Sequence, residues 1–380
     1  MKHNVDETWK LIDLPLSKSV RARELVLDAL NGREIEIDDE NDDIYVLSRA
    51  LKQCGEKRGA EVELDLHHSG TALRFLTAYC AVTEGSYRLT GSERLCERPI
   101  RPLVDALRRM GAKIEYAERD GYAPLMIEGR RLRGGRVALD ASVSSQFVSA
   151  LMLVADRVEG GVEIEYLGDV VSEAYINLTE KVITKYRRGE RCSGERDWSS
   201  ATVWYAMMTV EKRGEWRFEG LSLDSYQPDR AVVAVFEQLG VATKRIEGGV
   251  AIAWRGCKVD RLELDCANMP DAVMYIAVAA CLLGVEFEMS GVKTLRVKES
   301  DRIEALMTEM RKCGYVLRYD KAGKIAWNGE RCECEKVPHI KTYNDHRIAM
   351  SMAVVGLTRE IEIENKDVVN KSYPKFFSSY

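Results

Sequence analysis

Six short polar clusters along this chain each open onto a run of mostly apolar residues, and these junctions constrain the fold most. Ser, Thr, Asp and Asn side chains accept hydrogen bonds from the free amides of a helix start, so each cluster predicts a helix beginning. A helix that is apolar on every side has to be buried. We therefore predict six buried helices, whose polar starts would form an anion site if they converge. The clusters lie at residues 17–19, 69–71, 144–146, 197–200, 269–271 and 343–345.

Four amphipathic segments lie between these runs. Each has apolar residues at helical spacing, then a glycine, then an alternating strand pattern. Strand, buried helix, strand, exposed helix and strand follow one another at intervals of roughly 50 to 75 residues, which is typical of a repeat architecture. The pattern predicts an α/β protein built from βαβαββ-type units. The amphipathic segments cover residues 44–55, 102–116, 232–246 and 303–319.

Six such units divide naturally into two domains of three, since 380 residues exceed one ordinary core. The charged stretch 185–197 is the best candidate for a hinge, although the same composition suits a solvated loop. We expect residues 1–16 and 196–380 to form one domain and residues 17–195 to form the other, inserted domain. We expect the active site in the cleft between them.

Composition excludes several classes of function. A net charge of −5 gives no reason to expect a nucleic-acid partner. The polar start lacks the apolar core of a signal peptide, and the longest apolar run, 272–285, is too short to span a bilayer. We expect a cytoplasmic protein without a membrane partner. Cys332 and Cys334 stand near His339, but a metal site usually needs a second pair, so we predict no metal.

Cations gather near the predicted helix starts, and carboxylates are interleaved with them. Each cation alone is typical of a solvated surface, but together they indicate a pocket for a polyanion. Asp271 is an N-cap carboxylate, a catalytic group or both, and Glu299 is an ion-pair partner or a catalytic acid. His346 is a structural hydrogen-bonding residue or a catalyst, and the same choice holds for the pair 67–68. No G-x-S-x-G elbow, P-loop or dinucleotide fingerprint is present, which leaves cofactor-free chemistry.

Nine segments resemble, in the same order, the motifs of the 5-enolpyruvylshikimate-3-phosphate synthase family. RVKESDR (296–302) and YNDHRIAM (343–350) are together the most specific, whereas SSQF (144–147) alone is weak. The resemblance covers nearly the whole chain. The other segments are SKSVRAR (17–23), SGTALR (69–74), ERPIRPLVDALRRMGA (97–112), SEAY (172–175), MPDAVM (269–274) and NKSYPKFF (370–377).

This resemblance implies two domains, each of three repeated units around buried central helices, which is an inside-out α/β barrel. It implies transfer of the enolpyruvyl group of phosphoenolpyruvate to the 5-hydroxyl of shikimate 3-phosphate. The reaction proceeds by addition and elimination through a tetrahedral intermediate, releases phosphate and needs no metal or organic cofactor. These small molecules are the implied partners, and we expect a monomer whose domains close over them.

The resemblance also implies a role for each matching position. Asp271 accepts the proton of the attacking hydroxyl, and the methylene carbon takes its proton from Glu299, Lys18 or His346, a choice that the sequence leaves open. The residues implied for shikimate 3-phosphate are Lys18, Ser19, Arg23, Ser144, Ser145, Gln146, Ser172, Tyr175, Asp271, Thr294 and Lys298. Those implied for phosphoenolpyruvate are Lys18, Gly70, Arg98, Gln146, Arg302, Arg347 and Lys371.

Five positions depart from the family pattern: Leu16 replaces a glycine, His68 and Thr294 each replace an asparagine, and Arg21 and Ala22 stand where serine and asparagine are common. These changes bear on substrate affinity and leave sensitivity to the phosphonate glyphosate open. Two other functions compete with the implied one. Enolpyruvyl transfer to UDP-N-acetylglucosamine is disfavoured by the pair 18–19 and by the segment 144–146. A non-catalytic relative that only binds anions is disfavoured because the implied acid, base and arginines are all retained.

Overall fold

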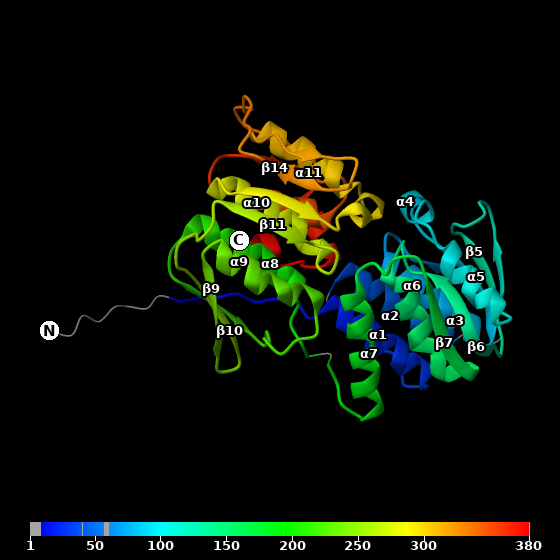
Figure 1. Ribbon diagram of the computed structural model, residues 1–380. Coiled ribbons are helices and arrows are strands. Elements are labelled where there is room, and N and C mark those ends of the chain that lie inside the picture. Colours follow the sequence, from blue (N-terminus) through cyan, green and yellow to red (C-terminus); the bar gives the residue numbers. More distant parts are fainter. Residues whose placement is uncertain (1–8, 40, 57–60, 193, 380) are drawn as a thin grey trace. The chain divides into compact units, whose positions relative to one another are not determined.

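One strand order recurs in three four-stranded sheets of the computed structural model, which describes residues 9–39, 41–56, 61–192 and 194–379 (Figure 1). In each sheet the first two strands are parallel and the other pairs are antiparallel, so a crossover connection joins the parallel strands. The sheets are β1 (Trp9–Leu11), β8 (Glu215–Glu219), β10 (Gly249–Trp254) and β9 (Val241–Ile246); β11 (Arg261–Asp265), β12 (Glu286–Ser290), β14 (Ile325–Trp327) and β13 (Arg318–Tyr319); and β2 (Glu61–Asp65), β3 (Gly85–Thr90), β5 (Leu125–Gly129) and β4 (Lys113–Tyr116).

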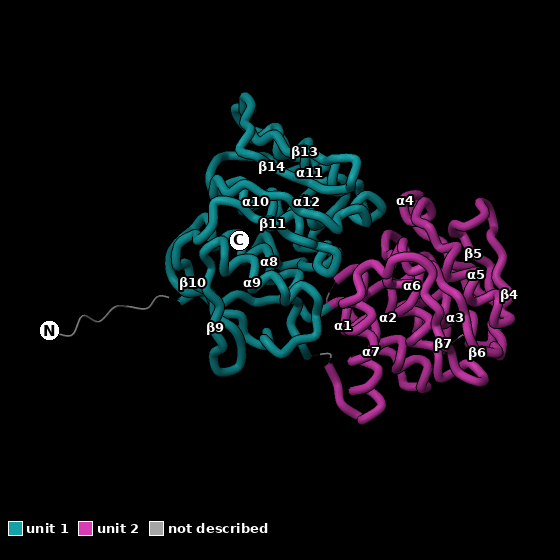
Figure 2. The backbone as a smooth tube through the Cα atoms, viewed as in Figure 1, with its two compact units in different colours: residues 1–17, 194–380 teal, residues 18–193 magenta. Residues whose placement is uncertain are grey.

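The chain divides into two compact units, shown in different colours in Figure 2. Unit 1 comprises residues 1–17 and 194–380, and unit 2 comprises residues 18–193. Each unit also holds a parallel pair of strands among its described residues. The pairs are β15 (His339–Ile340) with β16 (Glu362–Ile363) in unit 1 and β6 (Arg133–Asp140) with β7 (Glu159–Leu167) in unit 2. The predicted α/β class with two domains is confirmed, and the four-stranded sheets are mixed.

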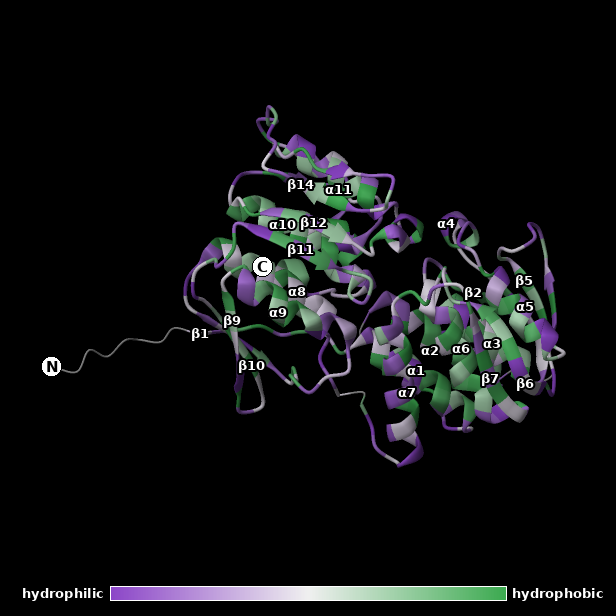
Figure 3. Cartoon of the chain, viewed as in Figure 1, coloured by the Kyte–Doolittle hydropathy of each residue, from purple (hydrophilic) through white to green (hydrophobic). Residues whose placement is uncertain are grey.

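Helices that are apolar along most of their length form the centre of each core. In unit 1, α8 (Trp198–Glu211) and α12 (His346–Val355) both pack against α10 (Val273–Leu283). In unit 2, α3 (Gly70–Val82) packs against α6 (Ser145–Val154). Figure 3 shows apolar residues running along α3, α6 and α10. The predicted burial of these helices is therefore confirmed.

Polar caps fix where four of these helices begin. Ser69 accepts a hydrogen bond from an amide of α3, Ser144 from one of α6, Asp197 from one of α8 and Asp345 from one of α12. Asp271 differs, because it lies inside the short 3-10 turn Pro270–Ala272, whose start has no side-chain cap. The interpretation of Asp271 as an N-cap is wrong, since its carboxylate binds side chains elsewhere in the unit.

Amphipathic helices lie between the strands as predicted, and glycines with positive φ follow them. Gly240 (φ +94°) ends the turn after α9 (Val232–Gln238), and Gly314 (φ +91°) ends the turn after α11 (Arg302–Lys312). The predicted stop at Gly55 is wrong, because α2 (Asp42–Glu56) continues through it.

No helix in the described part of the chain is long and apolar enough to cross a bilayer. The other helices are α1 (Lys18–Leu30), α4 (Glu93–Cys96), α5 (Arg101–Arg109), α7 (Glu173–Arg187) and α13 (Phe376–Ser379), with 3-10 turns at Ala155–Arg157, Pro228–Ala231, Lys293–Val297 and Lys366–Lys371.

Candidate active site

Arg302 lies at the centre of a buried cluster of charges in unit 1. It is the first residue of α11, is 1% exposed and meets three carboxylates. Its guanidinium donates to Asp345 Oδ2 (2.8 Å), to Asp271 Oδ1 (2.7 Å) and to Glu299 Oε2 (2.8 Å). Burial alone lowers the pKa of Arg302, but the three carboxylates outweigh burial and raise this pKa above its ordinary value. Arg302 therefore stays charged and ties the three acids together.

Asp271 faces two further cations besides Arg302. Its carboxylate lies 3.7 Å from Lys298 Nζ and 3.4 Å from Arg347 Nη2. Burial raises the pKa of Asp271, but Lys298, Arg347 and Arg302 outweigh burial and hold this pKa well below its ordinary value. The carboxylate is ionised at neutral pH, as a group that accepts a proton has to be.

Glu299 joins the same cluster from the segment before α11. One oxygen accepts from Arg302, and the other lies 3.4 Å from the ammonium of Lys371, which is largely buried. Unit 1 thus brings two candidate catalytic carboxylates, Asp271 and Glu299, together with four of the predicted cations. Half-buried Thr294 lies in the 3-10 turn that precedes this segment.

The start of α12 supplies the remaining groups of unit 1. Asp345 caps the helix by accepting a hydrogen bond from the Arg347 amide over 2.9 Å. It also accepts a hydrogen bond from the guanidinium of Arg302. Arg347 is 2% exposed and donates from Nη1 to the carbonyl of Ser199 over 3.2 Å. His346 is 1% exposed, with Nδ1 3.7 Å from Asp345 Oδ1. Two predicted residues, His346 and Arg347, are therefore fixed by the helix start.

Asp229 belongs to this cluster and was missed by the sequence analysis. It is 1% exposed, lies in the 3-10 turn before α9, and its Oδ2 accepts from the hydroxyl of Ser199. Burial, followed by repulsion from Asp271, raises the pKa of Asp229 to about 7, and Arg347 opposes this shift. The sequence carried no signal beyond a proline before an acid at a helix start.

Unit 2 holds a second group of predicted residues at the start of α3. A Cβ on Gly70 would overlap the guanidinium of Arg98 and lie 2.9 Å from Arg74 Nη1. Arg74 also donates to the carbonyls of Gly70 (3.1 Å) and Pro99 (3.0 Å). Two largely buried guanidiniums thus lie beside the positive end of a helix, which is a suitable environment for an anion.

Lys18 and Arg23, both on α1, differ in what they contact. Lys18 pairs with Asp43 of α2 over 2.8 Å. Arg23 is 3% exposed and donates to Thr179 Oγ1 (2.7 Å), to the carbonyl of Ser19 (2.7 Å) and, more weakly, to the carbonyl of Tyr175. Burial lowers the pKa of Arg23 to about 10. Arg23 therefore fixes the backbone of two other predicted residues, and its direct contact with a ligand stays a prediction.

The remaining predicted residues of unit 2 lie at two further helix starts. Ser144 caps α6, Ser145 is its first residue, and Gln146 donates to Thr71 Oγ1 over 3.1 Å. Ser172 precedes α7 with a left-handed backbone (φ +53°). Two helix starts, those of α3 and α6, are therefore linked by a side-chain hydrogen bond.

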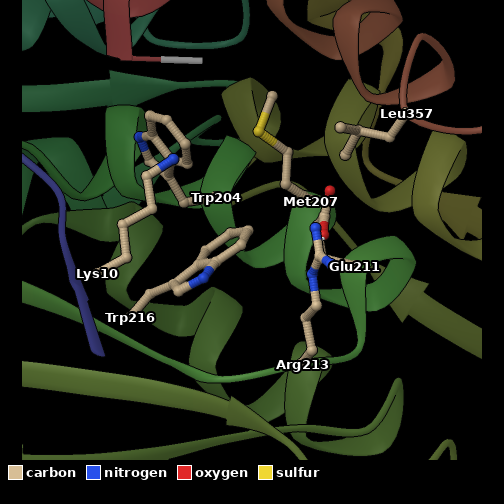
Figure 4. Close-up of a pocket in the computed structure, with 7 residues that line it drawn as sticks. All are labelled: Lys10, Trp204, Met207, Glu211, Arg213, Trp216 and Leu357. Atoms are coloured by element: carbon tan, nitrogen blue, oxygen red, sulfur yellow. The ribbon is translucent and has the colours of Figure 1, made fainter. Parts of the chain in front are cut away.

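A pocket of about 300 Å³ in unit 1 lies apart from these groups (Figure 4). Its walls include Trp204 and Trp216, and the ammonium of Lys10 lies 5.2 and 5.7 Å from the centres of their rings. No residue lining it is a predicted site residue. Within the described residues, His, Cys, Asp and Glu side chains form no group of three able to hold a metal ion.

The groups in each unit have a clear chemical character. Unit 1 presents two carboxylates held by arginines and lysines, and unit 2 presents helix starts lined by serine hydroxyls and guanidiniums. Carboxylates near cations serve proton transfer, while prepositioned arginines stabilise negative charge that develops during a reaction. Each set by itself contains the cations that an anionic substrate group requires.

Comparison with known proteins identifies the family. A family model described as EPSP synthase (3-phosphoshikimate 1-carboxyvinyltransferase) matches residues 5–189 and 186–379. The chain belongs to the EPSP synthase family. A 3-phosphoshikimate 1-carboxyvinyltransferase of Bacteroides fragilis is 38% identical over 387 residues, which cover 96% of this chain and 93% of the relative. One of Haemophilus influenzae is 34% identical over 417 residues, covering 97% and 95%.

Solved structures show the same fold. The structure of EPSP synthase from Acinetobacter baumannii superposes with a TM-score of 0.69 at 20% identity, covering 98% of this chain and 94% of that chain. The family resemblance predicted from the sequence is confirmed. The chain is therefore a transferase that moves the enolpyruvyl group of phosphoenolpyruvate to the 5-hydroxyl of shikimate 3-phosphate and releases phosphate.

Proposed function

We propose that the cluster of unit 1 and the helix starts of unit 2 contribute to one active site for this reaction. The observation that carries the proposal is the guanidinium of Arg302, which binds Asp271 and Glu299 at once, over 2.7 and 2.8 Å. A base for the hydroxyl and an acid for the carbon are both required in an addition to an enol ether. Arg302 holds one candidate for each role beside the other.

Asp271 is the proposed base. Its low pKa keeps it ionised, but a strongly stabilised carboxylate accepts a proton poorly. Anionic substrates entering the cluster would share its cations, Lys298, Arg302 and Arg347, and would thereby raise the pKa of Asp271. Substrate binding itself therefore activates the base.

Glu299 is the proposed acid for the methylene carbon, and Lys18 and His346 remain the two alternatives. Glu299 has a side chain that is 14% exposed, whereas His346 is 1% exposed in the start of α12. Glu299 also shares the guanidinium of Arg302 with the proposed base, Asp271, which favours Glu299 over His346. Separate substitution of Glu299 and Lys18 decides between these two.

The other predicted residues bind substrates in this proposal. Arg302, Arg347 and Lys371 of unit 1 act with Lys18, Gly70, Arg98 and Gln146 of unit 2 on phosphoenolpyruvate. Prepositioned cations of this kind also stabilise the tetrahedral intermediate, and removal of one typically costs about 10²–10³-fold in rate. The residues proposed for shikimate 3-phosphate are Lys18, Ser19, Arg23, Ser144, Ser145, Gln146, Ser172, Tyr175, Asp271, Thr294 and Lys298.

The finer architecture belongs to the same proposal. Each unit arranges its repeats around buried helices as an inside-out α/β barrel, residues 17–195 form the inserted domain, and both domains close over the substrates. The shared strand order of the three four-stranded sheets supports the repeat. We propose a cytoplasmic monomer, and all ten cysteines, which lie within the described residues, are free thiols as expected in a reducing compartment.

A phosphate-release assay tests these roles. Release is expected only with both substrates present, and Asp271→Asn and Glu299→Gln should each lower the rate by at least about 10²-fold. Asp224→Asn is the matched control, since Asp224 also binds an arginine, Arg245, but outside the cluster. Full activity in Asp271→Asn or Glu299→Gln would remove that residue from the mechanism. Binding of both substrates without release by the unmodified protein would support a non-catalytic relative.

A further inference from the structure

Two consecutive residues before α12, Tyr343 and Asn344, have left-handed backbones, with φ of +54° and +53°. Each such residue other than glycine costs roughly 1–3 kcal/mol and persists only when its surroundings enforce it. A bulky residue such as tyrosine is a marked outlier in this region. The turn leads directly into Asp345 and Arg347, so its direction sets where both side chains lie.

Glu309 is the group that holds this turn. It lies near the end of α11 and is 0% exposed. Its Oε1 accepts from the hydroxyl of Tyr343 over 2.7 Å, and its Oε2 accepts from the Lys341 amide over 3.1 Å and from Lys312 Nζ over 2.6 Å. Burying a charge is costly unless it is paired and hydrogen-bonded, and here both oxygens are engaged.

Helix α11 binds the segment before α12 through two of its side chains. Glu309 lies two turns after Arg302, so the two side chains project from the same face of the helix. Arg302 binds Asp345 over 2.8 Å, and Glu309 binds Tyr343 over 2.7 Å. The turn is closed between them by the Asp345 amide, which donates to the carbonyl of Thr342 over 2.8 Å. Both hydrogen bonds constrain the direction of the chain that enters α12.

We propose that Glu309 is a positioning residue for phosphoenolpyruvate binding, which acts by holding the Tyr343–Asn344 turn and so aiming Arg347. Glu309 belongs to neither predicted ligand set. The inference rests on the proposed role of Arg347. Burial and the bond to Glu309 raise the pKa of the Tyr343 hydroxyl, which keeps it a donor throughout the working pH range.

Paired tyrosine variants test this proposal. Tyr343→Phe removes a phenol–carboxylate hydrogen bond, and Tyr186→Phe removes a comparable bond, from Tyr186 to Asp28 over 2.8 Å in unit 2. We expect Tyr343→Phe to lower kcat/KM for phosphoenolpyruvate about tenfold, corresponding to about 1.4 kcal/mol. The KM for shikimate 3-phosphate should stay within about twofold, and Tyr186→Phe should leave both parameters within about twofold of the unmodified enzyme. Glu309→Gln keeps an acceptor for the phenol but turns its amide donor toward the Lys341 amide and Lys312 Nζ, so it should lower kcat/KM for phosphoenolpyruvate at least as much as Tyr343→Phe.

Several results would overturn the proposal. The first is a Tyr343→Phe enzyme that melts at a lower temperature but keeps its kcat/KM for phosphoenolpyruvate, which would make the bond merely structural. An equal loss in Tyr186→Phe would show a general effect of removing such bonds. Arg347→Lys in the same assay separates the role of Arg347 in binding from the positioning role of Glu309. An unchanged KM for phosphoenolpyruvate there refutes the role of Arg347 itself, whereas a raised KM with normal Tyr343→Phe kinetics refutes the positioning role alone.

Discussion

Asp345 offers a direct measure of what the ion-pair network contributes to unit 1. It is 0% exposed and accepts from Ser300 Oγ (3.0 Å), from Arg302 Nε (2.8 Å) and Nη2 (3.2 Å), and from the Arg347 amide (2.9 Å). Asp345→Asn keeps one oxygen for the helix cap but turns an amide donor toward another donor. Because asparagine caps a helix as well as aspartate does, the stability lost in this variant comes from the pair with Arg302.

The size of this loss follows from the geometry. Breaking a buried ion pair costs about 3–5 kcal/mol, and Arg302 keeps two other carboxylates, so we expect about 3 kcal/mol. A unit of about 200 residues loses roughly 2–4 °C of melting temperature per kcal/mol, which gives roughly 6–12 °C. The control is Asp197→Asn, since Asp197 caps α8 through Ser200 and binds no arginine side chain in the described structure. It should cost less than about 1 kcal/mol.

Differential scanning calorimetry of both variants, together with the KM for phosphoenolpyruvate, provides the comparison. Asp345→Asn should melt well below Asp197→Asn and should also raise this KM, because Arg302 loses the partner that orients it. Equal melting temperatures for the two variants would refute the reasoning, since they would show that the pair with Arg302 adds no stability beyond that of the helix cap.

Three further changes probe other parts of the site. Gly70→Ala places a methyl group against Arg98, the end of a flexible side chain, so stability should change by less than about 1 kcal/mol while the KM for phosphoenolpyruvate rises; an unchanged KM in initial-rate kinetics would contradict this. Because the pKa of Asp229 is raised to about 7 in the folded state, the folded protein binds an extra proton and loses stability as pH rises from about 4 to 7. Asp229→Asn should therefore melt higher than the unmodified enzyme at pH 8 and about the same at pH 4, and parallel melting curves would count against it. Arg23→Lys loses most of the four hydrogen bonds of a buried guanidinium and should lower the unfolding free energy of unit 2 by about 3 kcal/mol in denaturant titration.

Local rules made the helix starts predictable. Ser69, Ser144, Asp197 and Asp345 each stand before an apolar run, and each caps the helix that follows. Capping depends on residues two or three positions apart, so a sequence displays it directly. The glycine stop at Gly55 failed because helix ends depend on what the helix packs against as well as on propensity.

The partners inside the site were not predictable in the same way. Glu309 resembles any other acid on the outer end of an amphipathic helix, and its meaning comes from Tyr343, 34 residues away. Asp229 and Asp43 likewise acquire their roles from residues on other elements. The place of Asp271 in the site stays a prediction, but its assignment as a cap failed because three distant cations define its surroundings.

The first strand has a consequence for how the protein is made. Strand β1 pairs with β8, so its sheet is completed only after all of unit 2 has left the ribosome. The two segments of unit 1 that lead into and out of unit 2 run side by side. Leu16 forms a β-bridge with Arg196, and the Asp197 amide donates to the carbonyl of Pro15 over 3.0 Å. The inserted unit can therefore fold first during translation and hold the two ends of its host close together. Once unit 2 has folded, the entropy cost of closing the long loop is small, and β1 then pairs with β8 over a short distance.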